Sequence, residues 1–191
     1  MCGIVGYIGF RRACERILEG LQRLEYRGYD SSGVSVIDHE GNLSVQKAAG
    51  RLANLESLIA DDLPDSSIGI GHTRWATHGP PTDRNAHPHL GGGCANGQGH
   101  SVAVVHNGVV ENYHSIKARL EVEGYVFQSE TDSEVIAHLI DSCLKHILSN
   151  GPRLTDDITD SPFVVAVREA ISQLRGTYGL LVLFQDQPDL L

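Results

Sequence analysis

The chain opens, after Met1, with the segment Cys2-Gly3-Ile4-Val5-Gly6-Tyr7-Ile8-Gly9. This short apolar segment, interrupted by glycines, predicts a buried β-strand that packs closely against a neighbouring layer. The pattern then changes to that of an amphipathic helix over residues 11–24, whose apolar stripe consists of Cys14, Ile17, Leu21 and Leu24. A strand followed at once by a helix with one apolar face indicates a fold built in layers.

The remaining segments continue this alternation. Strands are predicted over residues 34–37, 43–46, 68–73, 102–105 and 178–184, and helices over residues 52–59, 113–123, 132–147 and 163–174. The segment Thr131-Asp132-Ser133-Glu134 fits a capping box, with Thr131 as N-cap and Glu134 reaching back. Residues 91–100 are rich in glycine, follow neither pattern and are predicted to form a surface loop. The alternation indicates an α+β fold with helices stacked over sheets.

The composition limits the possible functions. The chain has 191 residues, 41% of them hydrophobic, which suits one compact domain. Its 15 Lys and Arg against 24 Asp and Glu give a net charge of -9, which argues against a nucleic-acid surface. No apolar run approaches the ~20 residues of a membrane span, and no signal-peptide pattern is present, so we expect no membrane partner. The four cysteines form no CxxC pair and are expected to be free thiols of a cytoplasmic protein.

Cys2 is the sharpest single feature of the sequence. A small second residue generally allows removal of the initiator Met, which would place a thiol and an α-amine on the same residue. An unperturbed α-amine titrates near ~7.7–8.0, so it can accept the thiol proton near neutral pH. A positioned base makes a thiol a better nucleophile. From its position alone, however, Cys2 is equally a small residue that begins a strand.

Four further motifs change this reading. They are Tyr26-Arg27-Gly28-Tyr29-Asp30-Ser31, His72-Thr73-Arg74-Trp75-Ala76-Thr77-His78-Gly79, His106-Asn107-Gly108 and Ser129-Glu130-Thr131-Asp132. Each alone is weak to moderate, but together with the opening segment they resemble, in this order, the class II glutamine amidotransferase domain, an N-terminal-nucleophile hydrolase. More narrowly, they resemble the glutaminase half of the glutamine–fructose-6-phosphate aminotransferases. This resemblance implies a four-layer αββα sandwich of antiparallel sheets flanked by helices.

The resemblance also implies the reaction, which is hydrolysis of L-glutamine to glutamate and ammonia without a cofactor. Cys2 would attack the side-chain amide, while the side chain of Asn107 and the backbone N–H of Gly108 would form the oxyanion hole. Arg74 would bind the substrate α-carboxylate and Asp132 its α-ammonium.

The remaining motif residues receive supporting roles from the same resemblance. Thr77 and His78 would add hydrogen bonds to the bound amino acid, and Trp75 would wall the pocket. Arg27 and Asp30 would hold the loop beside the nucleophile.

Simpler interpretations of the main residues stay open at this point. Arg74 alone suits a surface cation, Asn107-Gly108 a hairpin turn, Asp132 a charge at a helix start and Trp75 core packing.

The histidines suggest a rival site. His87-Pro88-His89, with His72, His78 and His106, could indicate a metal centre. None of the usual zinc spacings, CxxC, HxxxH or HExxH, is present with a second cluster in this sequence. We therefore predict no metal ligand and no cofactor.

The resemblance gives the ammonia a destination. In that family it passes to a separate sugar isomerase domain, which converts fructose 6-phosphate to glucosamine 6-phosphate. We expect residues 2–191 to be a glutaminase domain that is incomplete at its C-terminus, with the sugar isomerase domain absent. Two alternatives remain, namely the glutaminase half of another amidotransferase, such as an amidophosphoribosyltransferase, and a non-catalytic truncated remnant.

Overall fold

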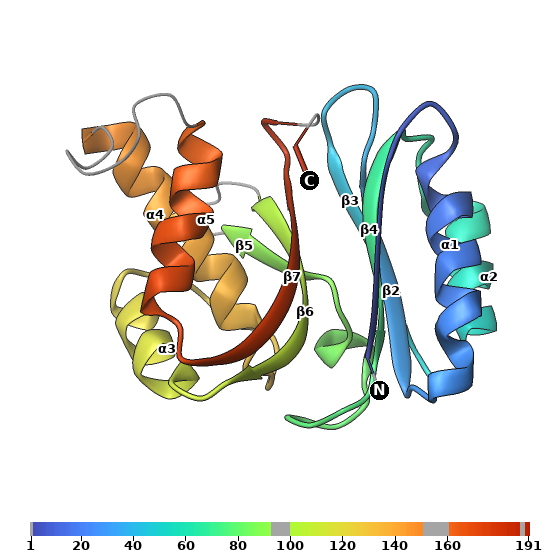
Figure 1. The fold of residues 1–191 in the computed structure, drawn as a ribbon, viewed down its shortest axis with the longest axis horizontal. Helices are drawn as coiled ribbons and strands as arrows, with labels where there is room; N and C mark the ends of the chain where they lie inside the picture. The colour runs from blue at the N-terminus through green and yellow to red at the C-terminus, as the bar shows by residue number, and fades with distance from the viewer. Residues whose placement is uncertain (1, 93–99, 151–160, 188–189) are drawn as a thin grey trace.

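The computed structural model describes residues 2–92, 100–150, 161–187 and 190–191. These residues form a four-stranded and a three-stranded sheet, both antiparallel, which face each other (Figure 1). In this part of the chain no helix is both long and apolar enough to cross a lipid bilayer.

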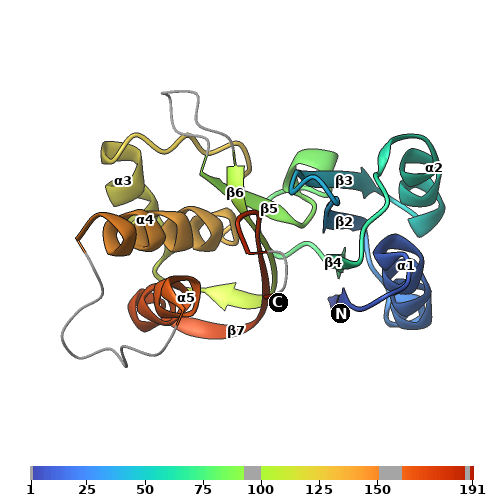
Figure 2. The ribbon, with the colours of Figure 1, turned by 90° about the horizontal axis from the view of Figure 1, so that it is seen from above.

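The four-stranded sheet has the order β1-β4-β2-β3. Its strands are β1 (Gly3–Ile8), β2 (Ser31–Ile37), β3 (Leu43–Ala49) and β4 (Ile68–Arg74). Helices α1 (Ala13–Leu24) and α2 (Leu52–Asp62) cover its outer face (Figure 2). Ala13, Ile17 and Leu21 recur every four residues along α1, so one helical face is fully buried against the sheet.

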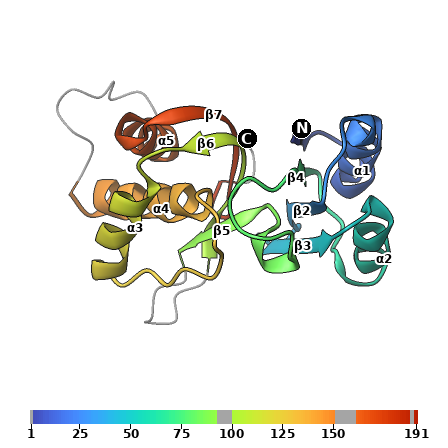
Figure 3. The same cartoon turned by 90° about the horizontal axis from the view of Figure 1, so that it is seen from below.

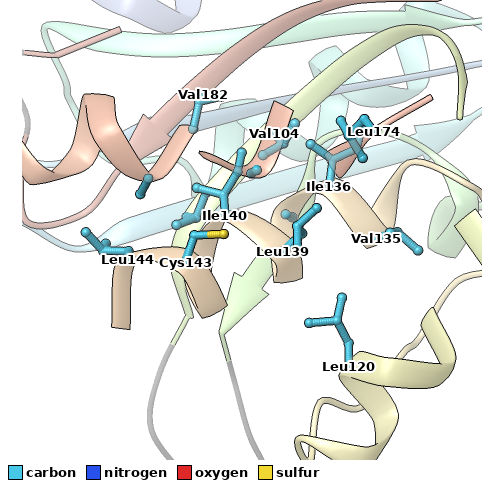
Figure 4. Packing of buried hydrophobic residues seen from close by; sticks show 14 of the residues in the cluster. Val104, Leu120, Val135, Ile136, Leu139, Ile140, Cys143, Leu144, Leu174 and Val182 are labelled. Atoms are coloured by element: carbon cyan, nitrogen blue, oxygen red, sulfur yellow. The ribbon is translucent and has the colours of Figure 1, made fainter. Parts of the chain in front are cut away.

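The three-stranded sheet has the order β5-β6-β7. It consists of β5 (His89–Gly92), β6 (His100–Val110) and β7 (Gly176–Phe184). Helices α4 (Glu134–Asn150) and α5 (Pro162–Gln173) cover its outer face, and α3 (Tyr113–Val122) lies beside α4 (Figure 3). Figure 4 shows how α4 side chains such as Ile136 and Ile140 pack beneath Val104 of β6 and Val182 of β7.

A separate core fills the space between the sheets. It consists of Ile37, Ile68, Ile70, Ala103, Val105 and Leu183, drawn from β2, β4, β6 and β7. Side chains alternate along a strand, so Asn107 shares the inward face of β6 with Val105, and Arg74 shares the inward face of β4 with Ile70. The four layers confirm the αββα sandwich that the resemblance implied.

Three local expectations were wrong. β1 is an edge strand and is only partly buried, since one of its sides has no neighbouring strand among the described residues. Residues 91 and 92 belong to β5 and residue 100 begins β6, so these three residues are not part of a loop. The rest of the predicted loop, residues 93–99, lies outside the described ranges. Asn107 and Gly108 lie within β6, because that strand continues well beyond the predicted 102–105.

The predicted capping box was also wrong. α4 begins at Glu134, whose carboxylate accepts the backbone N–H groups of Gln128 at 2.8 Å and Ser129 at 2.7 Å. The Thr131 hydroxyl instead lies 3.0 Å from Nε2 of His89. Residues 128–133 fold over the start of the helix. The Glu134 carboxylate therefore accepts N–H groups that come earlier in the sequence than the N-cap residue of the predicted capping box.

Candidate active site

Cys2 lies at the end of the four-stranded sheet where β1 begins and β4 ends. The last strand pair there is Gly3 with Thr73, and the backbone N–H of Trp75 donates to Cys2 Sγ at 3.3 Å. The sulfur also lies 3.8 Å from the carbonyl oxygen of Trp75. The thiol is partly exposed, as a nucleophile must be.

A cavity of about 500 Å³ opens over this thiol. It is lined by Cys2, Arg27, Trp75, Thr77, Asn107, Gly108 and Val109. These residues come from the residue just before β1, the 3₁₀ turn Glu25–Arg27, the segment after β4 and the C-terminal end of β6. Six of the residues predicted for the site, including the nucleophile Cys2, thus line one cavity.

Asn107 and Gly108 are held in this cavity by strand pairing. Asn107 pairs with Gly179 and Gly108 with Tyr178 of β7, so the two residues do not form a hairpin turn. Gly108 has φ of 152°, and a Cβ there would lie 1.8 Å from the carbonyl oxygen of Thr177. Only glycine fits this position, which leaves its backbone to line the cavity.

Trp75 forms a wall of the cavity. The residue is 53% exposed, which rules out core packing. Gly28 has φ of 74°, and a Cβ at this residue would lie 2.8 Å from the Trp75 ring. The indole therefore rests on the backbone of the loop that follows Arg27.

Asp30 fixes the segment that carries Trp75. Its carboxylate accepts the N–H of Ala76 at 2.5 Å and the hydroxyl of Ser31 at 3.1 Å. Its own backbone N–H donates to the carbonyl of Arg74 at 2.8 Å. This geometry suits the loop-holding role predicted for Asp30.

Arg74 is buried and makes no part of the cavity lining. Its guanidinium donates to the carbonyl oxygens of His78, of Gly79 at 3.3 Å and of Pro80 at 3.4 Å. Only 4% of the residue is exposed, so Arg74 is not a surface cation. Burial lowers the pKa of Arg74, while Asp30, Cys2 and Asp132 act in the opposite direction. Its contact with a substrate carboxylate stays a prediction, because three loop carbonyls engage it here.

Asp132 and His78 form a second group beside the cavity. Asp132 lies two residues before α4, not in its first turn, and accepts the N–H of Val110 at 2.8 Å. Its other oxygen lies 3.8 Å from Nδ1 of His78, whose ring meets the edge of Tyr113 at 5.7 Å between centroids. Thr77 Oγ1 lies 3.4 Å from the same His78 nitrogen. The structure thus connects Asp132 to the cavity through residues 77 and 78.

Four histidines form a buried cluster near Asn107. The His72 and His87 ring centroids are 4.3 Å apart, His87 and His89 are 4.6 Å apart, and His87 and His106 are 6.4 Å apart. Burial lowers the pKa of His72 to about 3 and the pKa values of His87, His89 and His106 below their ordinary range. Within the described ranges, no three His, Cys, Asp or Glu side chains are arranged to hold a metal ion.

Sequence reasoning missed two contributors. Val109 lines the cavity and His87 bonds the backbone of β6. Val109 carries no chemical signal beyond its place after Gly108. His87 was considered only as a metal ligand, and its hydrogen bond depends on how the sheets pack.

Known proteins resemble this chain in sequence. A family model described as a glutamine amidotransferase domain matches residues 94–191. The chain is 49% identical to the glutamine–fructose-6-phosphate aminotransferase (isomerizing) of Symbiobacterium thermophilum, a match that covers 99% of this chain and 27% of that protein. It is 48% identical to the protein of the same name from Caldanaerobacter subterraneus, over 100% of this chain and 28% of that protein. The chain therefore spans little more than a quarter of these relatives' length.

Solved structures agree with the fold. One, described as the allosteric regulatory enzyme of purine biosynthesis, is 26% identical with a TM-score of 0.73, over 97% of this chain and 36% of that chain. Another, the glutamine phosphoribosylpyrophosphate amidotransferase from B. subtilis complexed with ADP and GMP, is 26% identical with a TM-score of 0.71, over 97% of this chain and 35% of that chain. The layered fold, the cavity over Cys2 and these similarities agree, and the chain belongs to the glutamine amidotransferase family.

Proposed function

We propose that the chain hydrolyses L-glutamine to glutamate and ammonia, with Cys2 as the nucleophile. The observation that carries this proposal is that Cys2, Asn107 and Gly108, from distant parts of the sequence, line one cavity. The combination supplies a thiol, a side-chain amide donor and a backbone donor, which is what acyl transfer from an amide requires.

The first half of the reaction forms a thioester. After removal of Met1, the Cys2 thiol gives its proton to the α-amine of the same residue while sulfur bonds to the amide carbon of glutamine. Asn107 and Gly108 donate hydrogen bonds to the oxygen that becomes negative in the tetrahedral intermediate. The intermediate collapses when the C–N bond breaks and the departing nitrogen takes that proton, which releases ammonia.

Water completes the cycle. The α-amine removes a proton from water, whose oxygen attacks the thioester carbon, and the second tetrahedral intermediate again places its oxyanion near Asn107 and Gly108. Cleavage of the C–S bond returns the proton to sulfur and releases glutamate.

The charged ends of glutamine are assigned to the residues beside the cavity. Arg74 would bind the α-carboxylate and Asp132 the α-ammonium, with Thr77, His78 and Trp75 completing the pocket. Binding requires the Arg74 donors, now on the carbonyls of residues 78–80, to be shared with or transferred to the substrate. Arg27 and Asp30 keep the supporting role already described.

The acceptor of the ammonia is assigned to a sugar phosphate. The relatives named for fructose 6-phosphate are 48–49% identical to this chain, whereas the phosphoribosylpyrophosphate amidotransferase structure is 26% identical. We therefore propose that residues 2–191 act as the glutaminase region beside a sugar isomerase domain that makes glucosamine 6-phosphate. A cytoplasmic location, expected from the sequence, stays a prediction.

Glutamate release from glutamine by the purified protein tests the proposal. Wild-type protein should release glutamate and ammonia in equal amounts. The Cys2→Ala variant should release neither product. Cys14→Ala is the matched control, because Cys14 is a half-buried thiol on α1 whose pKa burial raises to about 11. Equal rates for wild type and Cys2→Ala would reject catalysis by Cys2 and favour a non-catalytic glutamine-binding remnant.

Covalent labelling gives a second test of Cys2 as the nucleophile. The glutamine analogue 6-diazo-5-oxo-norleucine should add once to the N-terminal peptide, and mass spectrometry should show that Met1 is absent. A peptide that retains Met1 and carries no adduct would count against the mechanism.

A further inference from the structure

The two strands β5 and β6 end at different places. The pairing of β5 with β6 runs from Gly92, opposite His100, to His89, opposite Val104. β6 continues to Val110, so beyond residue 104 its N–H groups that point to the β5 side meet no partner strand among the described residues. If the register continued by two residues, His106 would face His87.

The His87 backbone does not continue the sheet. Its carbonyl oxygen lies against β2 of the other sheet, where a Cβ on Gly33 would be only 2.1 Å from that oxygen. The chain has therefore turned from one sheet towards the other before residue 89. The His106 N–H would lack a carbonyl acceptor at this point.

The His87 ring takes the place of that carbonyl. The His106 backbone N–H donates to Nδ1 of His87 at 3.1 Å. Only 3% of His87 is exposed, and its ring stacks on His72 at an interplanar angle of 27°. An imidazole nitrogen can accept only when it carries no proton, and burial together with neighbouring His72 lowers the pKa of His87 well below its ordinary value.

The bond lies one residue before the predicted oxyanion donors. On the other side of β6, Asn107 and Gly108 are aligned by Gly179 and Tyr178 of β7. We infer that His87 is a positioning residue for Asn107 and Gly108, because its Nδ1 completes the sheet on the side that β5 leaves open. The inference rests on the proposed function for its catalytic consequence, although the hydrogen bond can be tested without activity.

The His106 side chain adds a second attachment at the same step. Its Nδ1 lies 2.8 Å from the hydroxyl of Ser133, which lies 3.4 Å from Asp132. His87 thus holds the backbone of residue 106, and Ser133 holds its ring. Together they fix the part of β6 that immediately precedes Asn107 and Gly108.

Two substitutions separate the acceptor from the ring. His87→Asn keeps an acceptor at the place of Nδ1, whereas His87→Phe keeps a buried ring and removes the acceptor. His72→Phe is the matched control, because both His72 ring nitrogens lie without a hydrogen-bond partner among the described residues. Displaced oxyanion donors impair mainly the transition state, so His87→Phe should lower kcat by about 10- to 100-fold with little change in KM for glutamine. His87→Asn should restore most of the loss, and His72→Phe should retain wild-type kcat.

Amide hydrogen exchange tests the bond itself. In His87→Phe, the amide of residue 106 should exchange at least about tenfold faster than in wild type, while β2 amides keep their protection. If exchange at residue 106 and kcat in His87→Phe both match those of His72→Phe, the positioning role is overturned. If wild type releases no glutamate but the exchange pattern appears, the proposed function fails and the hydrogen bond stands.

Discussion

The backbone N–H of Trp75 donates a hydrogen bond to Sγ of Cys2 at 3.3 Å, between residues 73 positions apart. The bond lies just beyond the last pair of β1 and β4, Gly3 with Thr73. The sheet that ends at this point therefore sets the place of the sulfur. The same segment supplies the cavity wall, so nucleophile and wall share one support.

Gly108→Ala should reduce activity by at least ~10²-fold, comparable to loss of one oxyanion donor. A methyl group at this residue would collide with the Thr177 carbonyl and displace the β6 backbone. Steady-state kcat with glutamine measures the effect. Gly124→Ala is the control, because Gly124 also has a positive φ, 93°, but apart from its chain neighbours no described residue lies within 4 Å of its Cβ position. Similar kcat values for the two variants would contradict the role of Gly108.

Arg74→Lys should raise KM for glutamine about 10- to 100-fold, because a lysine cannot form a two-pronged contact with a carboxylate and loses charged hydrogen bonds. It should also lower the melting temperature, since Arg74 holds the carbonyls of residues 78–80. Arg84→Lys, at an exposed residue, should change neither value. A lower melting temperature with unchanged KM would show that Arg74 only braces the loop.

Asp30→Ala should lower kcat/KM about tenfold or more by releasing the Ala76 N–H and with it the Trp75 segment. Asp38→Ala is a matched control, because Asp38 braces a turn in the same way, through the N–H groups of Glu40 and Asn42. Kinetics of both variants, with unfolding curves measured alongside, compare the two braces. An equal loss of kcat/KM in both would show that general destabilisation is responsible.

Acid should destabilise the protein through the buried histidines. Burial lowers the pKa of His72 to about 3 from an ordinary 6.5, so between these values the unfolded chain binds a proton that the folded chain does not. Stability is therefore highest above pH 6.5 and falls as the pH drops towards 3. The contribution of one such residue to the slope is about 1.4 kcal/mol per pH unit.

Urea unfolding between pH 7 and pH 4 measures this dependence. His72→Phe should flatten the slope by about one proton, whereas substitution of the exposed His39 should leave it unchanged. Identical slopes in His72→Phe and wild type would contradict a neutral buried His72.

Much of the layered fold could be predicted because strand and helix patterns in this chain are strong. The Ile17 and Leu21 stripe predicted the burial of α1. Motif order likewise predicted that Cys2, Asn107 and Gly108 belong to one site, and their shared cavity agrees.

What could not be predicted depends on packing between distant segments. Glu134 bonds Gln128 and Ser129 because the preceding loop folds back over α4, which a four-residue motif cannot encode. The bond from His106 to His87 depends on where β5 stops pairing and on a close approach at Gly33. Neither hydrogen-bond arrangement corresponds to a short sequence motif with a fixed spacing, so neither could be predicted from the sequence.

The cavity has two halves of different construction. Asn107 and Gly108 belong to the central strand of a sheet, whereas Trp75 and Thr77 follow β4 in an irregular segment. Exchange of residues 75–80 with those of a relative should thus alter which amino acid is admitted, while Asn107 and Gly108 keep their places on β6. An engineer seeking a new amide donor would begin with that segment and leave the strand untouched.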